Sequence, residues 1–257
     1  MLGVYFSGTG NTRFCAEKFC YHYDGSVPLS IEDNNVVGAI NKSDEIVLAY
    51  PVYFSNIPKI AKDFIHINNL CFADKRVYII ATMGLFSGDG AGCGARLLKK
   101  CGAKIIGGLH LKMPDCIGDV KALKKPLEQN RQIVTDAEQK IEQAVKALKQ
   151  GKPTKEGLGF LYHVAGLLGQ RLWFYSKTMH YTDKLYIREN RCVGCGKCVV
   201  LCPMKNLTIA NKKASTDNTC TMCYRCINNC PNKAITLLGK ELIEQCKTDN
   251  YVLKQTV

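Results

Sequence analysis

A repeated pattern of cysteines constrains this chain of 257 residues more than any other feature. Residues 192–203 read C-x2-C-x2-C-x3-C-P, and residues 220–231 repeat the pattern 28 positions later. Two intervening residues let three thiolates from one tight loop face a common centre, and the proline turns the chain after the fourth cysteine. The repeat indicates an internal duplication that builds two groups of sulfur ligands.

The chain has fifteen cysteines, and eight of them lie between Cys192 and Cys230. Residues 1–8 contain neither a basic segment nor a long apolar one, so no secretory signal is predicted. We therefore expect a cytoplasmic protein. The reducing cytosol disfavours disulfides, so the clustered cysteines are interpreted as metal ligands.

Both runs resemble those of bacterial ferredoxins with two 4Fe-4S clusters, in which the fourth cysteine of each run serves the other cluster. The resemblance implies that each cluster takes ligands from both runs. The implied sets are Cys192, Cys195, Cys198 and Cys230 for one cluster, and Cys220, Cys223, Cys226 and Cys202 for the other. Zinc is the alternative, because C-x2-C pairs also bind it. Two complete runs, each ending in proline, favour iron-sulfur clusters.

Residues 1–150 alternate short apolar runs with helical patterns, which is typical of a parallel sheet covered by helices. The predicted strands are 1–6, 27–31, 45–50, 76–82 and 104–111. The predicted helices lie near 12–22, 58–69, 90–101 and 124–149, and the crossover at 32–43 has the weakest pattern. Because Gly151-Lys152-Pro153 stops the last helix, we place a domain boundary near residue 150.

The first predicted strand leads directly into Ser7-Gly8-Thr9-Gly10-Asn11-Thr12 and then into a helix. Small residues and hydroxyls at this place allow backbone N–H groups and a helix N-terminus to enclose a phosphate. The loop contains no lysine and fits neither the P-loop nor the dinucleotide fingerprint. A monophosphate held by neutral hydrogen bonds is the ligand that suits it.

This loop resembles the S/T-x-T-G-x-T loop by which flavodoxins bind the phosphate of FMN, with Ser7, Thr9, Gly10, Asn11 and Thr12 at the matching positions. The resemblance implies an α/β doubly wound parallel sheet of five strands in the order 2-1-3-4-5, with the flavin at the carboxyl ends of the strands. The implied FMN-binding residues are Ser7, Gly8, Thr9, Gly10, Asn11, Thr12, Pro51, Val52, Tyr53, Phe54, Ser55, Asn56, Thr82, Met83, Gly84, Phe86, Gly88 and Asp89.

Three aromatic residues, Tyr53, Phe54 and Phe86, are candidates for stacking on the flavin ring, and backbone groups near Gly84 would meet its polar edge. The loop at 82–89 lacks the tryptophan and tyrosine that flavodoxins usually carry. For each aromatic residue, ordinary core packing is the alternative.

Residues 158–175 are unusually apolar, and their spacing predicts a helix buried on most of its circumference. Packing between two domains is the favoured interpretation, and contact with a partner or a membrane surface is the alternative. His163, Gln170 and Arg171 argue against a transmembrane span.

Taken together, residues 1–150 and 191–235 resemble the flavodoxin-ferredoxin fusion proteins of anaerobic bacteria. The resemblance implies a flavodoxin-like FMN-binding domain at 1–150, an apolar helical connector at 151–184, and a small α+β two-cluster ferredoxin domain with a C-terminal tail at 185–257.

The formal net charge is +13, and two clusters with their thiolates would contribute about −4. The basic surface is either simply solvated or attracts an acidic redox partner, such as a ferredoxin or an oxidoreductase. No spacing typical of nucleic-acid-binding motifs is present, so nucleic acid is not an expected partner. The oligomeric state stays open.

We therefore expect an electron carrier in which two 4Fe-4S clusters and one FMN pass single electrons between a low-potential donor and an acceptor. One alternative is an enzyme whose FMN reduces a small organic substrate or a quinone, with the clusters as its supply. Another is a redox sensor that binds a partner through its basic surface or its connector. No Ser-His-Asp or paired-carboxylate pattern is found, so no catalytic residue is assigned.

Overall fold

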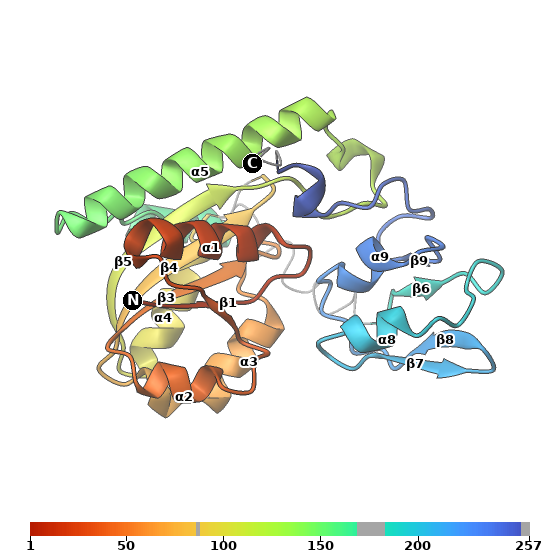
Figure 1. Cartoon of the computed structure of the whole chain (residues 1–257), viewed down its shortest axis with the longest axis horizontal. Helices are drawn as coiled ribbons and strands as arrows, with labels where there is room; N and C mark the ends of the chain where they lie inside the picture. The colour runs from red at the N-terminus through yellow and green to blue at the C-terminus, as the bar shows by residue number, and fades with distance from the viewer. Residues whose placement is uncertain (86–87, 169–182, 253–257) are drawn as a thin grey trace.

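A computed structural model describes residues 1–85, 88–168 and 183–252 (Figure 1). Phe86, a candidate for stacking on the flavin, and residues 169–175 of the predicted apolar helix lie outside the described residues. Within the described part of the chain, no helix is both long and apolar enough to span a membrane.

Five parallel strands form one sheet in the order β2-β1-β3-β4-β5, which confirms the predicted fold class. The strands are β1 (Leu2–Tyr5), β2 (Leu29–Ser30), β3 (Glu45–Pro51), β4 (Arg76–Met83) and β5 (Lys104–Lys112). The central strands β3 and β4 are continuous apolar runs because helices cover both of their faces.

Helices α1 (Asn11–Asp24) and α5 (Leu127–Lys149) cover one face of the sheet (Figure 1). The other face is covered by α2 (Val36–Asn41), α3 (Lys59–Ile67) and α4 (Gly90–Lys100). Side chains along β3 alternate between the two layers: Ile46 and Leu48 belong to the core beneath α2, α3 and α4, and Val47 belongs to the core beneath α1 and α5.

Several helix ends differ from the predicted ones. The helix expected at 58–69 ends at Ile67, and a 3-10 turn, η1 (Asn69–Phe72), follows and buries Phe72. Helix α5 starts at Leu127 because Pro126 occupies its N-cap position, and a short 3-10 turn, η2 (Lys121–Leu123), precedes it. The weak pattern at 32–43 forms only the six residues of α2.

After α5 the chain runs along the edge strand β5, where Lys155 forms a bridge with Gly108. It then enters α6 (Phe160–Gly166). Phe160 and Leu161 are 77% and 81% exposed, so the prediction of a helix buried on most of its circumference is wrong over this stretch. The short helix rests on the sheet domain through small residues, because Gly166 approaches Gly88 too closely for a Cβ at position 88.

The C-terminal part forms a small lobe beyond the carboxyl ends of the parallel strands (Figure 1). Its strands are β6 (Tyr186–Ile187), β7 (Leu207–Ala210), β8 (Lys213–Thr216) and β9 (Ile235–Thr236), with β6 antiparallel to β9 and β7 antiparallel to β8. Two short helices, α8 (Lys197–Leu201) and α9 (Arg225–Asn229), begin 28 residues apart inside the two cysteine runs. A 3-10 turn, η4 (Thr248–Asn250), lies near the end of the described chain.

Candidate functional site

A cavity of about 360 Å³ opens at the carboxyl ends of the sheet strands. It is lined by the three loops that follow β1, β3 and β4, by the segment after β5, and by three residues of the second cysteine run. Ligands of open α/β sheets bind at this edge, where the strand order reverses.

Most of the residues implied for FMN binding line this cavity. They are Ser7, Gly8, Thr9, Asn11, Thr12, Pro51, Val52, Tyr53, Phe54, Thr82, Met83 and Gly84. The other implied residues that the structure describes are not in its lining: Gly10, Ser55, Asn56, Gly88 and Asp89.

The loop between β1 and α1 is shaped by its own side chains. Ser7 Oγ accepts a hydrogen bond from the backbone N–H of Gly10 at 3.1 Å, and Gly10 adopts a left-handed φ of 107° immediately before α1. The first N–H groups of a helix have no partner inside the helix and carry its positive dipole end. Thr12 Oγ1, 2.8 Å from Thr82 Oγ1, ties the loop to the end of β4. The loop can therefore hold a phosphate without a cationic side chain.

The loop after β3 makes a tight turn in which Tyr53 and Asn56 exchange both backbone hydrogen bonds, each 3.0 Å long. The two central residues, Phe54 and Ser55, have positive φ angles of 50° and 57°, as a type I′ turn requires. The turn leaves Tyr53 and Phe54 on the cavity side. Burial holds the pKa of the Tyr53 phenol well above its usual value, so its hydroxyl stays protonated.

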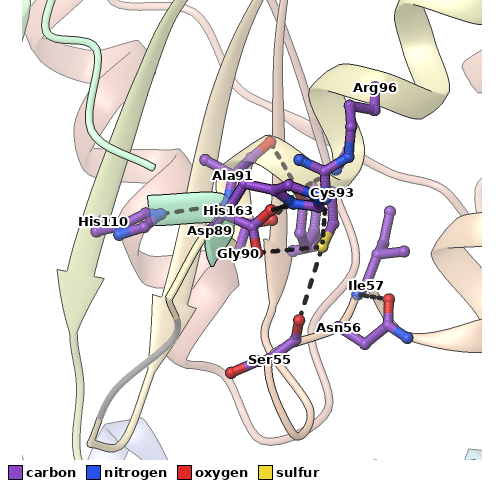
Figure 2. A network of polar contacts seen from close by, with 12 residues as sticks. Ser55, Asn56, Ile57, Asp89, Gly90, Ala91, Cys93, Arg96, His110 and His163 are labelled. Atoms are coloured by element: carbon purple, nitrogen blue, oxygen red, sulfur yellow. Dashed lines mark hydrogen bonds and ion pairs between the residues drawn. The ribbon is translucent and has the colours of Figure 1, made fainter. Parts of the chain in front are cut away.

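Asp89 lies in a network of polar contacts with Cys93 and Arg96 of α4 and with His163 of α6 (Figure 2). Its side chain is fully buried, and Oδ2 accepts hydrogen bonds from Arg96 at 2.7 Å and from Nδ1 of His163 at 2.9 Å. The carbonyl oxygen of Ser55 faces the Cys93 sulfur, 3.6 Å away, in the same network. Asp89 thus joins α4 to α6.

Some cavity residues were missed in the sequence analysis. Those of the sheet domain are Leu85, Met113, Pro114, Asp115, Ile117 and Leu123. The segment 113–117 follows the predicted fifth strand directly, so the rule that ligands bind at strand ends could have identified it. Burial raises the pKa of the Asp115 carboxyl, whose Oδ1 accepts the backbone N–H of Ile117 at 2.8 Å.

The eight clustered cysteines converge in two groups of four. Cys192, Cys195, Cys198 and Cys230 line one space in the lobe, and Cys202, Cys220, Cys223 and Cys226 line the other. These are the sets that the ferredoxin resemblance implies. Within residues 1–85, 88–168 and 183–252, no three cysteine, histidine or carboxylate side chains are placed to share one metal ion. In a cubane cluster each thiolate binds a different iron, so four cysteines around one space are a donor set that fits a cluster.

Backbone N–H groups point at the sulfurs of both groups. Ala214 and Ala234 donate to Cys192 and Cys230, each at 3.3 Å. In the other group, Asn206 donates to Cys202 at 3.3 Å and Met222 donates to Cys220 at 3.4 Å. Such hydrogen bonds stabilise negative charge on the sulfurs and raise the reduction potential of a cluster.

The second cysteine run is docked onto the loop after β1. Arg225 donates to the carbonyl oxygen of Ser7 at 2.8 Å and forms two bonds, at 2.8 and 2.6 Å, with the Glu32 carboxylate. Its guanidinium also lies over the Phe6 ring, 5.7 Å from the centroid. Cys223 is packed in the core of the sheet domain, and Phe54 packs against the core of the lobe. The two domains therefore share apolar packing around the cavity.

Asp119 makes a second connection between the domains. Its side chain is buried; Oδ1 accepts the Tyr224 hydroxyl at 3.0 Å, and Oδ2 accepts the backbone N–H groups of Leu237, Leu238 and Gly239 at 2.7 to 3.1 Å. These four hydrogen bonds compensate for the burial of the Asp119 carboxylate, so no cationic side chain is needed beside it. It fixes the position of Tyr224 at the cavity.

The C-terminal segment returns from the lobe to the sheet domain. Thr248 N–H donates to the carbonyl oxygen of Thr9 at 3.2 Å, and Thr248 Oγ1 donates to Oδ1 of Asn11 at 2.8 Å. The amide of Asn11 in turn donates to the carbonyl oxygen of Pro114 at 2.7 Å. Tyr251, 2% exposed, packs in the core between α1 and α5. This segment therefore braces the loop that fits a phosphate.

Among solved structures, the chain is similar to the two-electron reduced flavodoxin of Megasphaera elsdenii, with 22% identity, a TM-score of 0.42, and coverage of 57% of this chain and 100% of that one. Flavodoxin 2 from Bacillus cereus has 18% identity and a TM-score of 0.42, covering 58% and 97%. A flavodoxin from the domain Archaea has 13% identity and a TM-score of 0.41, covering 58% and 97%.

No curated protein matches the chain. Two family models do: a flavodoxin domain matches residues 2–101, and a 4Fe-4S dicluster domain matches residues 184–231. The chain therefore combines a flavodoxin domain and a 4Fe-4S dicluster domain in one polypeptide, which is the arrangement of a flavodoxin-ferredoxin fusion and of a flavin and iron-sulfur electron-transfer protein.

Proposed function

We propose that FMN binds in the cavity and exchanges single electrons with a 4Fe-4S cluster held by Cys202, Cys220, Cys223 and Cys226. One observation carries the proposal: Cys223 lines both the cavity and the space between these four cysteines. A residue that touches both sites brings the two cofactors close, and a short separation is what electron transfer requires.

The loop Ser7–Thr12 would hold the phosphate of FMN, through backbone N–H groups at the start of α1 and the hydroxyl of Thr9. The apolar part of the cavity, which includes Tyr53, Phe54 and Met83, would enclose the ring. Bound FMN supplies chemistry that accepts or gives electrons one or two at a time.

Asp115 is the titratable carboxyl that lines the cavity beside Gly84. Its Oδ1 accepts a backbone hydrogen bond, so Oδ2 is the oxygen that would carry a proton. Because burial raises the pKa of this carboxyl, we assign to it the holding and release of a proton when the charge in the cavity changes.

The cysteines of the first group, Cys192, Cys195, Cys198 and Cys230, do not line the flavin cavity, and Cys195 is exposed. A cluster in this group would be the site where electrons enter or leave the protein. Three exposed lysines surround the group: Lys197 begins α8, and Lys212 and Lys233 lie on loops. Lys197 lines the space between the four cysteines of this group. Lys212 lies next to Gly194, and Lys233 follows Cys230 by three residues. An acidic low-potential redox protein in the cytoplasm is the partner that this surface fits.

The proposal can be tested with protein purified without oxygen. We expect one FMN and about eight irons per chain. Reduction of the flavin by a reduced ferredoxin should slow at least tenfold in Cys226→Ala, because Cys226 lines the second cysteine group and not the flavin cavity. Cys71→Ala, outside both groups, is the matched control.

Full-rate flavin reduction in Cys226→Ala, with FMN still bound, would refute the electron path. Steady turnover with a small organic acceptor, and none with an acidic protein, would favour an enzyme over a carrier. Iron without flavin would refute the assignment of the cavity.

A further inference from the structure

Both cysteine runs have left-handed residues at the same two positions, but the residue types at these positions differ. In the first run these positions are Gly194 and Gly196, with φ angles of 66° and 74°. In the second run the equivalent residues, 28 positions later, are Met222 and Tyr224, with φ angles of 60° and 58°. Side chains with a Cβ are strained in this region, and glycine is not.

The side chains that replace the glycines line the flavin cavity. Met222 and Tyr224 flank Cys223 in its wall, and they are only 6% and 2% exposed. Gly194 and Gly196 instead line the space of the first cysteine group, away from the flavin cavity. The run that faces the cavity therefore carries side chains where the other run carries none.

Tyr224 has a structural partner, because its hydroxyl donates to Asp119. Met222 makes no such hydrogen bond: its apolar side chain packs in the core of the lobe, and the residue also lines the cavity. Strained residues that persist next to a binding site are commonly held there for function. A thioether is polarisable and makes favourable contacts with aromatic rings.

We infer that Met222 is a flavin-contacting residue, by which the second cysteine run covers the ring of FMN from the side of the lobe. The inference rests on the proposed function, since it takes FMN as the occupant of the cavity. It adds that one side chain next to a cluster ligand sets how tightly the ring is bound.

The test compares flavin binding by the full chain with its clusters in place and its flavin removed. Met222→Gly should weaken binding of both FMN and riboflavin about tenfold, because the contact is with the ring and not with the phosphate. Because Met222 also packs in the core of the lobe, the thermal midpoint of the flavin-free chain should fall, so binding is compared at a temperature at which both flavin-free chains are folded. Met222→Asn, which tolerates the same conformation, should weaken binding likewise and guards against a folding defect.

Lys205→Gly is the matched control. Lys205 has a φ of 51° in the same lobe and does not line the cavity, so its replacement relieves strain without affecting flavin binding. Unchanged flavin affinity in both Met222 variants would overturn the inference, as would equal weakening of flavin binding in Met222→Gly and Lys205→Gly. If the unaltered chain takes up no FMN, the proposed function fails, and this inference fails with it.

Discussion

The carbonyl oxygen of Cys223 lies where a side chain on Gly8 would begin: a Cβ at Gly8 would stand 2.1 Å from it. The loop that fits a phosphate and the loop that carries a cluster ligand therefore meet backbone to backbone. Only glycine permits this approach, because no Cβ contact is as short as 2.1 Å in a real structure. A single residue of the sheet domain thus sets the separation of the two sites.

Gly8→Ala should push the second cysteine run away from the cavity. The neighbouring atom is backbone, so the alanine methyl can be accommodated only by separating the loops. We expect electron transfer between the cluster and FMN to slow at least tenfold, measured as flavin reduction by a reduced ferredoxin. Gly38→Ala is the control, because nothing lies within 4 Å of its added Cβ. Equal rates in the two variants would contradict this account of the contact.

Arg225 should couple the domains through Glu32. Arg225→Lys keeps the charge but loses the planar fork that binds the carboxylate with two hydrogen bonds. In a double-mutant cycle with Glu32→Gln, we expect a coupling energy of about 1 kcal/mol, measured from the thermal midpoints of the holoprotein. For comparison, Arg13→Gln removes a more exposed ion pair, with Glu17, and should lower the free energy of unfolding by less than this coupling energy. A coupling energy near zero would mean that Arg225 joins the domains through its other contacts, with Ser7 and Phe6, and not through Glu32.

The sheet order and the loop after β1 could be predicted from the sequence because each signal is local. Apolar runs mark the strands, and Ser7–Thr12 follows the first strand at once. The predicted role of Asp89 depended on its place after a strand. Its ion pair with Arg96 is made within α4, the helix that Asp89 caps, but its hydrogen bond with His163 joins residues 74 positions apart, so no local pattern predicts that contact.

The contribution of Met222 and Tyr224 to the cavity could not be predicted for a different reason. Their positions inside a cysteine run indicate only that they are near a cluster. They reach the cavity because Arg225 and Asp119 dock the lobe against the sheet domain. The burial of α6 could not be predicted either. The apolar spacing over 158–175 predicts a helix, but it does not establish what the helix packs against, and the apolar side chains Phe160 and Leu161 are exposed.

His110 should make stability fall in acid. Burial lowers the pKa of its imidazole from 6.5 to about 4, and its Nε2 accepts the backbone N–H of Ala91, which requires the neutral ring. The unfolded chain binds this proton more readily, so stability is complete above pH 6.5 and is lost as the pH falls toward 4. At pH 5 the loss should be about 2 kcal/mol.

His110→Gln should therefore flatten the pH dependence of the thermal midpoint between pH 7.5 and 5, because an amide does not titrate there. The exposed His66→Gln is the control and should leave the dependence as it is. A variant at His110 with the same acid slope as the unaltered chain would show that other groups govern it.

Thr248 should strengthen the binding of the phosphate of FMN although it lies 237 residues from Asn11. Thr248→Val keeps the volume of the side chain but removes the hydroxyl that holds Oδ1 of Asn11, so the loop at the start of α1 loses its brace. We expect FMN to bind about fivefold more weakly, the loss of one hydrogen bond of about 1 kcal/mol, while riboflavin, which has no phosphate, binds as before. Thr135→Val, on the exposed side of α5, is the matched control. Equally weaker binding of FMN and riboflavin would show that the C-terminal segment shapes the whole cavity and not only the loop at the start of α1. Unchanged binding of both flavins would show that this loop keeps its conformation without the hydroxyl of Thr248.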